Sequence, residues 1–433
     1  MNRRGFLKST AAAAAAGFSM RYLGGCSQAA GPAAAVRPAR LGANERFKVA
    51  FIGCGGRANQ LMTTEDLAVH ADIVAVADCF LPRIEERAKK VPGSENWRRY
   101  QDYRQLLDKE KLDAVFVPTT THARALAATH AMQAGLDVYA EKPVCLTIAE
   151  GRYLVNAARH YKKVFQVGTQ QRSMPPNVYA SKLVREGAIG KIKEVIACNF
   201  LAPNKWQPKP AEPMPDGLDW DKWCNQTELR PYRKELQFGW AQWGDYDGGG
   251  VSWGVTGWGT HALDQVQCAL GTDYTGPVEI WLEEPGPQGK VTMKYPDGTL
   301  LKLHGPKRDL ADLGAIFVGE KGTIEIKRGS FTSTLPELLE NQPPTIDANV
   351  PGEVKWHIAN FFDCIRSGKR PNADIEIAHR STTVCYLVNI CRDLGRKLRW
   401  DPKAEKFAGD KEADRMLSRE RRKGYELPNI GWL

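Results

Sequence analysis

The chain has 433 residues, of which 42% are hydrophobic and 25% are charged, and this balance excludes a largely disordered protein, a collagen and a small disulfide scaffold. The formal charge is +10, but residues 1–40 hold six basic side chains and no acid, which leaves +4 on the rest of the chain. That near-neutral remainder does not indicate nucleic-acid binding, and no apolar run reaches the roughly 18 residues that a transmembrane helix needs.

The first residues are typical of an export signal. The pair Arg3 and Arg4 resembles the twin-arginine motif, and an Ala-rich stretch follows it. The sequence Leu-Gly-Gly-Cys ending at Cys26 resembles a lipobox, whose cysteine is lipidated after cleavage, although Ala33–Ala35 could serve an ordinary signal peptidase. We therefore predict that residues 1–44 are a signal peptide and tether that bring the protein to the periplasm or anchor it outside the cytoplasmic membrane.

A nucleotide-binding pattern begins just after this segment. The apolar, β-prone run 47–52 leads into Gly-x-Gly-x-x-Ala at residues 53–58, and a second strand-like run ends in Asp78. Glycines allow a tight turn and close approach of the backbone to a pyrophosphate, while an acid at this spacing binds the ribose hydroxyls and repels a 2′-phosphate. The pattern predicts NAD as cofactor, with a glycine turn in some other α/β protein as the alternative. The candidate cofactor-binding residues here are Gly53, Gly55, Gly56, Arg57 and Asp78.

Strand and helix patterns continue to alternate as far as residue 172. Strand-like runs at 112–117, 137–140 and 164–167 are separated by helical patterns at 124–134 and 148–160. This order predicts a parallel sheet with ligands at the carboxyl ends of its strands. The polar candidates at those ends are Thr119, His122, Lys142 and Gln171. His122 has an alternative role as a cap at the start of a helix.

The tripeptide Glu141-Lys142-Pro143 makes a resemblance specific. Together with the motifs above it is similar to the glucose–fructose oxidoreductase/inositol dehydrogenase (Gfo/Idh/MocA) family over residues 46–433. The resemblance implies an N-terminal Rossmann domain, a C-terminal domain with an open, mostly antiparallel sheet, and a site between them. It also implies that Glu141 belongs to the cofactor site, that Lys142 points at the reacting alcohol, and that the Lys142–Pro143 bond is cis.

The second half of the chain fits this expectation. A strand-like run at 192–200 is followed by five more between residues 278 and 326, joined by turn signals. Seven of the 12 tryptophans fall within residues 203–260, where they could stack on sugar faces or simply pack in a core. We predict an α/β Rossmann domain at 45–172, a substrate-binding α+β domain at 173–398 with helices at 356–365 and 378–394, and a tail at 399–433. The family resemblance implies that the tail wraps over the first domain or a neighbouring subunit.

A helical run from Trp258 to Leu270 contains the second catalytic candidate. His261 and Asp264 are three residues apart and so share a helix face. They match the last two polar positions of the family pattern Asp-x-Gly-x-His-x-x-Asp, whereas Gly257 replaces its first aspartate. The resemblance makes His261 the acid/base partner of Lys142, with a structural histidine as the alternative. The candidate substrate-binding residues are Arg172, Tyr246, Trp258 and Asp264.

These features predict an exported NAD-dependent oxidoreductase that acts on a secondary alcohol of a sugar, sugar derivative or cyclitol. Because free NAD should be scarce outside the cytoplasm, we expect the cofactor to be bound tightly. It would then return to its starting redox state without leaving the protein. Two alternatives stay open, namely a redox-neutral NAD-dependent glycosidase or lyase, and a non-catalytic carbohydrate-binding relative. We expect a homo-oligomer, no metal and buried thiols without disulfides, because the cysteines are scattered.

Overall fold

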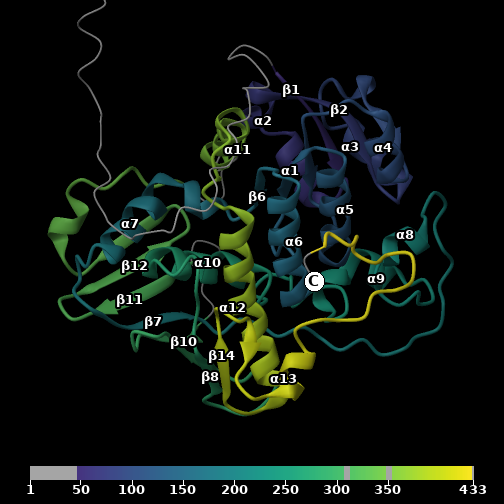
Figure 1. Ribbon diagram of the computed structural model, residues 1–433. Coiled ribbons are helices and arrows are strands. Elements are labelled where there is room, and N and C mark those ends of the chain that lie inside the picture. The colour runs from purple at the N-terminus through teal and green to yellow at the C-terminus, as the bar shows by residue number, and fades with distance from the viewer. Residues whose placement is uncertain (1–45, 307–312, 348–353, 432–433) are drawn as a thin grey trace, which may run out of the picture. The chain divides into compact units, whose positions relative to one another are not determined.

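The computed structural model describes residues 46–306, 313–347 and 354–431, and two sheets organise them (Figure 1). The predicted signal peptide, including Arg3, Arg4 and Cys26, lies outside these ranges. The first sheet has six strands in the order β3-β2-β1-β4-β5-β6, and every neighbouring pair is parallel. Its strands are β1 (Phe47–Ile52), β2 (Ala71–Ala77), β3 (Arg98–Tyr100), β4 (Ala114–Val117), β5 (Asp137–Ala140) and β6 (Phe165–Val167).

Helices cover both faces of this first sheet. Along β1, Phe47, Val49 and Phe51 point into one buried cluster, whereas Ala50 and Ile52 point into another. The sequence of such a strand is almost entirely apolar because both of its faces are buried. The helices of this part are α1 (Gly56–Met62), α2 (Glu65–His70), α3 (Leu81–Ala88), α4 (Tyr103–Lys109), α5 (Thr121–Gln133) and α6 (Ile148–His160).

The second sheet has nine strands in the order β13-β12-β11-β7-β10-β9-β8-β14-β15. All its neighbouring pairs are antiparallel except β7 with β10, so the predicted fold class, a Rossmann domain followed by a mostly antiparallel sheet, is confirmed. Its strands are β7 (Ile192–Cys198), β8 (Glu279–Leu282), β9 (Val291–Lys294), β10 (Leu300–Gly305), β11 (Ala315–Gly319), β12 (Thr323–Lys327), β13 (Ser330–Ser333), β14 (Leu398–Asp401) and β15 (Lys406–Phe407).

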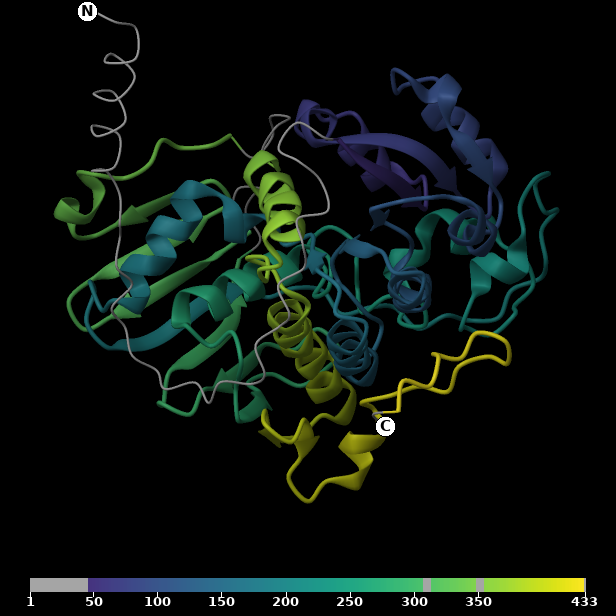
Figure 2. The ribbon, with the colours of Figure 1, turned by 45° about the horizontal axis from the view of Figure 1, so that its top comes forward.

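One face of the second sheet packs against helices α7, α10 and α12. Alternate strand residues such as Val195, Leu301 and Phe317 are fully buried on that face. Helix α12 also contacts α6 and β6 of the first domain, and it runs between the two sheets in both ribbon views (Figures 1 and 2). The remaining helices are α7 (Pro175–Arg185), α8 (Trp220–Cys224), α9 (Lys234–Gly239), α10 (Trp258–Leu270), α11 (Lys355–Ser367), α12 (Ile375–Leu394) and α13 (Lys411–Arg415).

Two late segments of the chain return to the first domain. Helix α11 completes one of its cores, where Phe362 lies 4.8 Å from Phe47, ring centre to ring centre. After β14 and β15 join the second sheet, the tail crosses back, Tyr153 donates a hydrogen bond to the Pro428 carbonyl at 2.6 Å, and Ile430 enters the core beside α6. The yellow segment of Figure 2 follows this return. The first core therefore draws on residues well beyond 172, the predicted end of that domain.

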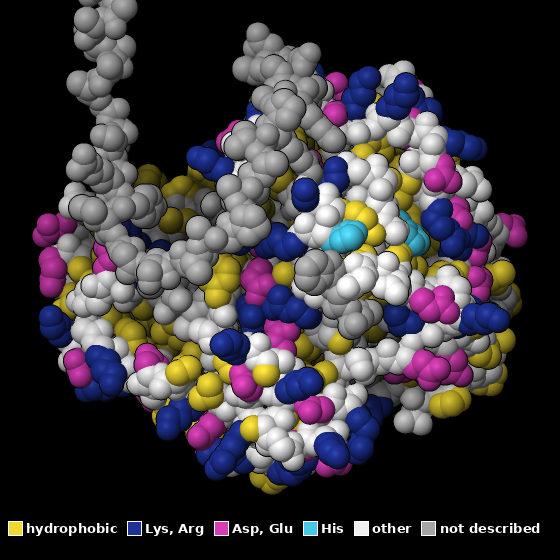
Figure 3. Space-filling model, in the orientation of Figure 1, with side chains coloured by type: hydrophobic (Ala, Val, Ile, Leu, Met, Phe, Trp, Pro, Cys, Tyr) yellow, Lys and Arg dark blue, Asp and Glu magenta, His cyan; other side chains and the backbone are white. Residues whose placement is uncertain are grey.

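The surface and the thiols show no unusual feature among the described residues. Basic and acidic side chains are interspersed over the face in Figure 3.

No disulfide joins the cysteines of residues 46–306, 313–347 and 354–431, and no group of acidic, histidine or cysteine side chains there is arranged to hold a metal ion. Within the same residues, no helix combines the length and apolar character needed to cross a bilayer.

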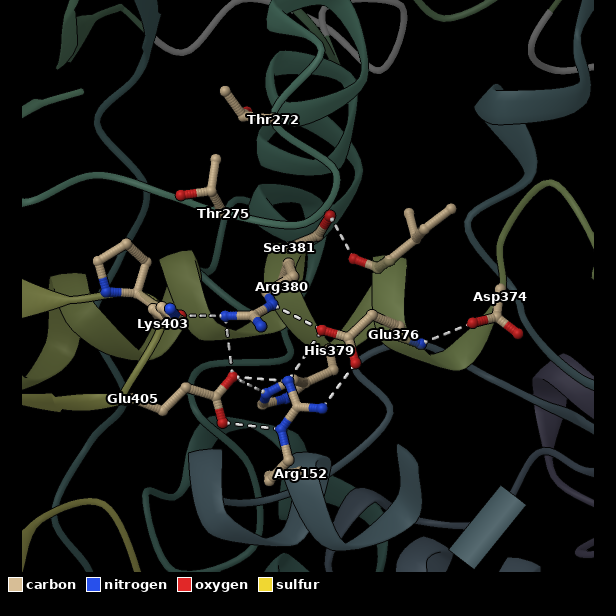
Figure 4. A network of polar contacts seen from close by, with 12 residues as sticks. Arg152, Thr272, Thr275, Asp374, Glu376, His379, Arg380, Ser381, Lys403 and Glu405 are labelled. Atoms are coloured by element: carbon tan, nitrogen blue, oxygen red, sulfur yellow. Dashed lines mark hydrogen bonds and ion pairs between the residues drawn. The ribbon is translucent and has the colours of Figure 1, made fainter. Parts of the chain in front are cut away.

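An ionic network joins α6, α12 and the tail (Figure 4). Arg152 of α6 donates to both carboxylate oxygens of Glu376 at 2.6 and 2.8 Å and to both of Glu405 at 2.9 and 2.8 Å. His379 Nε2 lies 2.7 Å from Glu405. Helix α12 can approach α6 this closely because residue 151 is glycine, since a Cβ there would lie 2.3 Å from His379 Nδ1.

Opposite charges dominate the titration of this network. Burial alone would raise the pKa of Glu376, but Arg152 and Arg380 bring it down to about 2. Burial would likewise raise the pKa of Glu405, yet Arg152 and His379 hold it well below its ordinary value. A carboxylate whose pKa is depressed by folding stabilises the protein above its unfolded-state pKa, and that stabilisation is lost as the pH falls.

We expect Glu405→Gln to lower the free energy of unfolding by about 2 kcal/mol at pH 7, between the values for exposed and buried ion pairs. The difference from wild type should narrow below about pH 4, where Glu405 takes up a proton in the unfolded chain but stays ionised in the folded protein. Urea unfolding at pH 7, 5 and 3 measures both effects. Glu412→Gln is the matched control, because Glu412 is 59% exposed in its ion pair with Arg396. If Glu412→Gln destabilised the protein as much as Glu405→Gln, the buried network would contribute no more than an exposed ion pair.

Candidate functional site

A cavity of about 210 Å³ lies at the carboxyl ends of β1, β2 and β4. This edge is where ligands bind in parallel α/β sheets. The structure brings together here six of the predicted cofactor-binding residues, which are Gly53, Gly55, Gly56, Arg57, Asp78 and Thr119. Their convergence on one cavity follows from the parallel order of the three strands.

The glycine turn keeps the floor of this cavity open. Gly53 has φ of +97°, and a Cβ there would lie 3.1 Å from backbone and side-chain atoms of Thr119. A Cβ at Gly56 would meet nothing within 4 Å, and one at Gly55 would meet only Arg83 Nη1 at 3.5 Å. The turn therefore exposes backbone N–H groups to the cavity, which fits the close approach of a pyrophosphate.

The carboxylate of Asp78 is fixed in place at the end of β2. Oδ2 accepts a hydrogen bond from the Cys54 N–H at 2.8 Å, and Oδ1 accepts one from the Phe80 N–H at 2.9 Å. Burial raises the pKa of Asp78, while nearby Arg83 and these two N–H groups act against the rise. Each carboxylate oxygen retains acceptor capacity, so Asp78 can also receive the hydroxyls of a ribose.

Aromatic residues from far along the chain close the cavity. Trp223 of α8, Trp240 and Tyr425 of the tail line it together with Arg83. The tail is tied to the α8 segment because both Arg422 and the Tyr425 hydroxyl donate to the Asp221 carboxylate. We had not predicted these residues for the cofactor site, although the density of tryptophans between residues 203 and 260 marked the segment as unusual.

Lys142 and His261 approach each other from different domains. The Lys142–Pro143 bond is cis, and Lys142 Nζ donates to the Gly257 carbonyl at 2.8 Å. Burial lowers the pKa of Lys142 to about 8. His261, in the first turn of α10, is only 6% exposed, and burial together with the charge of Lys142 brings its pKa well below 6.5. At neutral pH a neutral imidazole therefore stands beside an amine close to its own titration point.

Two further observations connect this pair with the cavity. Arg57, which lines the cavity, donates through Nε to Glu141 at 2.8 Å, and Glu141 precedes Lys142. Gly168 leaves the space for that carboxylate, because a Cβ there would lie 2.5 Å from Glu141 Oε1. Among the described residues, Nδ1 of His261 is buried without a hydrogen-bond partner, whereas buried polar atoms are normally paired.

The other candidates do not line the cofactor cavity and lie in packed surroundings. His122 Nε2 lies 2.8 Å from the Trp223 carbonyl, its ring stands edge-on to Tyr246, and burial lowers its pKa to about 4. Gln171 donates to the Leu313 carbonyl at 2.7 Å. Trp258 packs against Trp253 with ring centres 4.5 Å apart. Their binding roles stay predictions.

Arg172 and Asp264 form an ion pair that braces α10. Arg172 Nε lies 2.9 and 2.8 Å from the two carboxylate oxygens of Asp264, and both side chains are almost fully buried. Ser381 of α12 donates to the same carboxylate at 2.6 Å. Arg172 belongs to the short helix η2 (Gln170–Ser173), so the pair fixes the helix that carries His261 against the end of the first domain. A direct contact of either residue with substrate stays a prediction.

Comparison with known proteins gives both domains the same family. A model described as an oxidoreductase family, NAD-binding Rossmann fold, matches residues 47–169, and one described as the C-terminal alpha/beta domain of an oxidoreductase family matches residues 181–427. D-apiose dehydrogenase of Paraburkholderia graminis is 34% identical over 147 residues, which are 34% of this chain and 38% of that protein. scyllo-Inositol 2-dehydrogenase (NAD(+)) of Bacillus subtilis is 28% identical over 121 residues, 28% and 34% of the two chains. The matches thus span about a third of these relatives.

Solved structures show the same fold over most of the chain. The aldose-aldose oxidoreductase of Caulobacter crescentus, complexed with glycerol, superposes with a TM-score of 0.58 and 17% identity over 82% of this chain and 100% of that one. The WlbA dehydrogenase of Bordetella pertussis, in complex with NADH and UDP-GlcNAcA, gives a TM-score of 0.59 and 15% identity over 82% and 99% of the two chains. At this identity the likeness establishes the fold alone.

The position of Asp78 generates a prediction about cofactor choice. Asp78→Ser combined with Cys79→Arg should raise the affinity for NADP relative to NAD by roughly tenfold or more, because a repelling carboxylate gives way to a guanidinium. Titrations followed by protein fluorescence would measure both dissociation constants. Asp72→Ser at the opposite end of β2 is the control, since Asp72 only pairs with Arg46 on the surface, and it should change neither constant. Release of NADP rather than NAD from denatured native protein would refute the assignment.

Proposed function

The chain belongs to the Gfo/Idh/MocA oxidoreductase family, and on that basis we propose that it is an exported, NAD-dependent oxidoreductase of a sugar, sugar derivative or cyclitol. The observation that carries this proposal is the approach of Lys142 and His261 beside a cavity whose glycine turn and Asp78 fit NAD. The names of the relatives, D-apiose dehydrogenase and scyllo-inositol 2-dehydrogenase, support a polyhydroxylated substrate.

The cofactor site is assigned to particular groups of this chain. The backbone of Gly53–Arg57 would hold the pyrophosphate, and Asp78 would hold the ribose hydroxyls. Arg57 also orients Glu141 and so fixes the residue that precedes Lys142. Bound NAD supplies the hydride acceptor, while the protein positions the alcohol and manages its proton.

His261 and Lys142 share the proton of the reacting hydroxyl. The lowered pKa of His261 leaves the imidazole neutral at pH 7 and so able to accept a proton. Lys142, with its pKa lowered to about 8, stabilises negative charge on the oxygen as an ammonium and serves as a base once it has lost its proton. Adjacent hydroxyls of a sugar or cyclitol provide the additional polar contacts that such a site needs.

Tight retention of NAD is supported by the closure of the cavity. Trp223, Trp240 and Tyr425 line the cavity together with Asp78, where the adenosine would lie, and the tail that brings Tyr425 is held by Asp221. A cofactor covered by two separate segments should leave only when one of them moves. Slow release suits a protein that loads NAD before export by the twin-arginine route and then works where free NAD is scarce.

Association into a homo-oligomer is supported by the outer face of the second sheet. Ile196 and Ile316 are cross-strand neighbours on the face opposite the helices, and both are half-buried in the single chain. Half-buried apolar pairs across neighbouring strands are suited to burial against a second copy.

We expect Lys142→Ala and His261→Ala each to lower turnover by roughly 10²–10⁴-fold and to leave NAD bound, because neither side chain holds the pyrophosphate. If the pair acts as one unit, the double variant should be little worse than the poorer single variant. The measurement is NADH absorbance after mixing the protein with a panel of sugars and cyclitols, with product analysis in parallel. Lys182→Ala on the surface of α7 and His304→Ala on β10 are matched controls.

Near-normal turnover in His261→Ala would show that this histidine is structural. A released aglycone without net oxidation of the sugar would replace the proposed net dehydrogenase by a redox-neutral glycosidase. A nucleotide-free protein that shows no absorbance change with any sugar would contradict the oxidoreductase assignment.

The proposed export has its own test. Changing both Arg3 and Arg4 to Lys should retain the precursor in the cytoplasm, because the export receptor distinguishes guanidinium groups from ammonium groups. Fractionation of cells that express the full chain would locate the protein. Unchanged export of the double-lysine variant would overturn the twin-arginine assignment. In the exported protein, Cys26→Ala should yield a soluble product if Cys26 carries the lipid.

A further inference from the structure

The loop before α10 has no room for the aspartate that the family pattern places at position 257. A Cβ built on Gly257 would lie 2.1 Å from the Val251 carbonyl oxygen and 2.9 Å from the carbonyl carbon of Gly250. Gly254 is closed in the same way, with the Gly249 carbonyl oxygen 1.9 Å from its Cβ position. Glycine at position 257 is thus required by the fold of residues 249–257.

A different carboxylate, that of Asp247, is buried beside this loop. Its Oδ2 accepts a hydrogen bond from Thr121 at 2.5 Å, and its Oδ1 accepts one from Thr256. Gly257, the next residue after Thr256, has the carbonyl that accepts from Lys142 Nζ at 2.8 Å. A Cβ at Gly250 would lie 2.7 Å from the carboxylate of Asp247, so this glycine leaves the space that Asp247 fills.

We propose that Asp247 takes the place of the aspartate missing at position 257 and acts as the positioning residue for Lys142. Through Thr256 it fixes the carbonyl group that holds Lys142 Nζ, and its carboxylate supplies the negative charge facing that amine. The inference rests on the proposed function in one respect, which is that Lys142 handles the proton of the reacting alcohol.

Two carboxylates, Glu141 and Asp247, offset the charge of Lys142. Glu141 is the other carboxylate facing Lys142, but it is bound to Arg57 at 2.8 Å. Arg124, a second buried cation in this region, donates only to uncharged oxygens, namely the carbonyls of Thr119 and Pro143 and the Thr121 hydroxyl. Buried cations need a nearby anion. Glu141 and Asp247 together meet that need for Arg124 and Lys142, and Asp247 is the one on the loop that binds Lys142 Nζ.

Titration of Lys142 reflects all of these groups. Burial lowers its pKa to about 8, Glu141 and Asp247 raise it, and Arg57 and Arg124 lower it further. His261 also faces Lys142 but is neutral over the range in which the amine titrates. Removal of the negative charge at Asp247 must therefore lower the pKa of Lys142, and a single close opposite charge typically accounts for about one pKa unit or more.

The test is Asp247→Asn, which keeps the size of the side chain and its ability to hydrogen-bond to both threonines. Protein labelled with [ε-13C]lysine gives a carbon signal for each lysine, and the signal absent from Lys142→Arg identifies Lys142. We expect the titration midpoint of this signal to fall by about one pH unit in Asp247→Asn. The pH profile of alcohol oxidation should move by the same amount in the same direction.

Asp245→Asn is the matched control, two residues away. Asp245 pairs with Arg230 at 2.7 Å and is 42% exposed, so its loss should leave the Lys142 midpoint unchanged. If Asp247→Asn does not fold, Asp247→Ser removes the same charge with a smaller side chain and is measured in its place. A midpoint that does not move in the folded variant overturns the proposal and reduces Asp247 to a packing role.

The two readouts separate this proposal from the proposed function. The carbon signal reports on Lys142 whether or not the protein turns over a substrate. A shifted midpoint in a protein that oxidises no alcohol would support the pairing and refute the proposed function. Normal oxidation with an unshifted midpoint would refute the pairing alone.

Discussion

The site depends on keeping the amine of Lys142 out of water while it remains able to carry a proton. Removing a cation from water is costly, and its pKa falls unless nearby groups compensate. Here the compensation comes from both domains, with Glu141 on the side of the first sheet and the Gly257 carbonyl and Asp247 on the loop before α10. Burial and the charge of Lys142 keep His261 neutral, so the two members of the pair are tuned together.

These pKa shifts require that the two domains keep a fixed position relative to each other. Helix α12 and the C-terminal tail hold them in that position. Helix α12 lies against α6, α10 and β6, and its Ser381 braces the Asp264 carboxylate below His261. The ionic network around Arg152 and Glu405 fastens the tail to the same helix (Figure 4). His261 is thus carried by helix α10, and Lys142 by the connection between β5 and α6.

Much of the first domain could be predicted because its strands are apolar on both faces and end in glycine, acid or lysine motifs. The short strands β3 and β15 escaped prediction, since three or two residues give no periodic signal. Six of the cavity-lining residues, from Gly53 to Thr119, followed from strand ends. His122 lies at such an end too, yet its side chain turns into a packed cluster, and a sequence pattern does not fix that direction. Tyr425 could not be foreseen because its contact spans the whole chain.

Gly257 shows that the residue at one motif position does not by itself decide whether the site contains a carboxylate. By position the chain lacks an aspartate, which had kept a non-catalytic relative among the alternatives. The structure shows a tight glycine loop at 249–257, and that tightness brings Asp247 next to Thr256 and the carbonyl that holds Lys142. The chemistry needs a negative charge near the amine of Lys142. The Coulomb energy depends on the distance between the charges and not on the sequence position of the carboxylate. Gly257 excludes the expected aspartate, and Gly250 in the same loop leaves the space for its replacement.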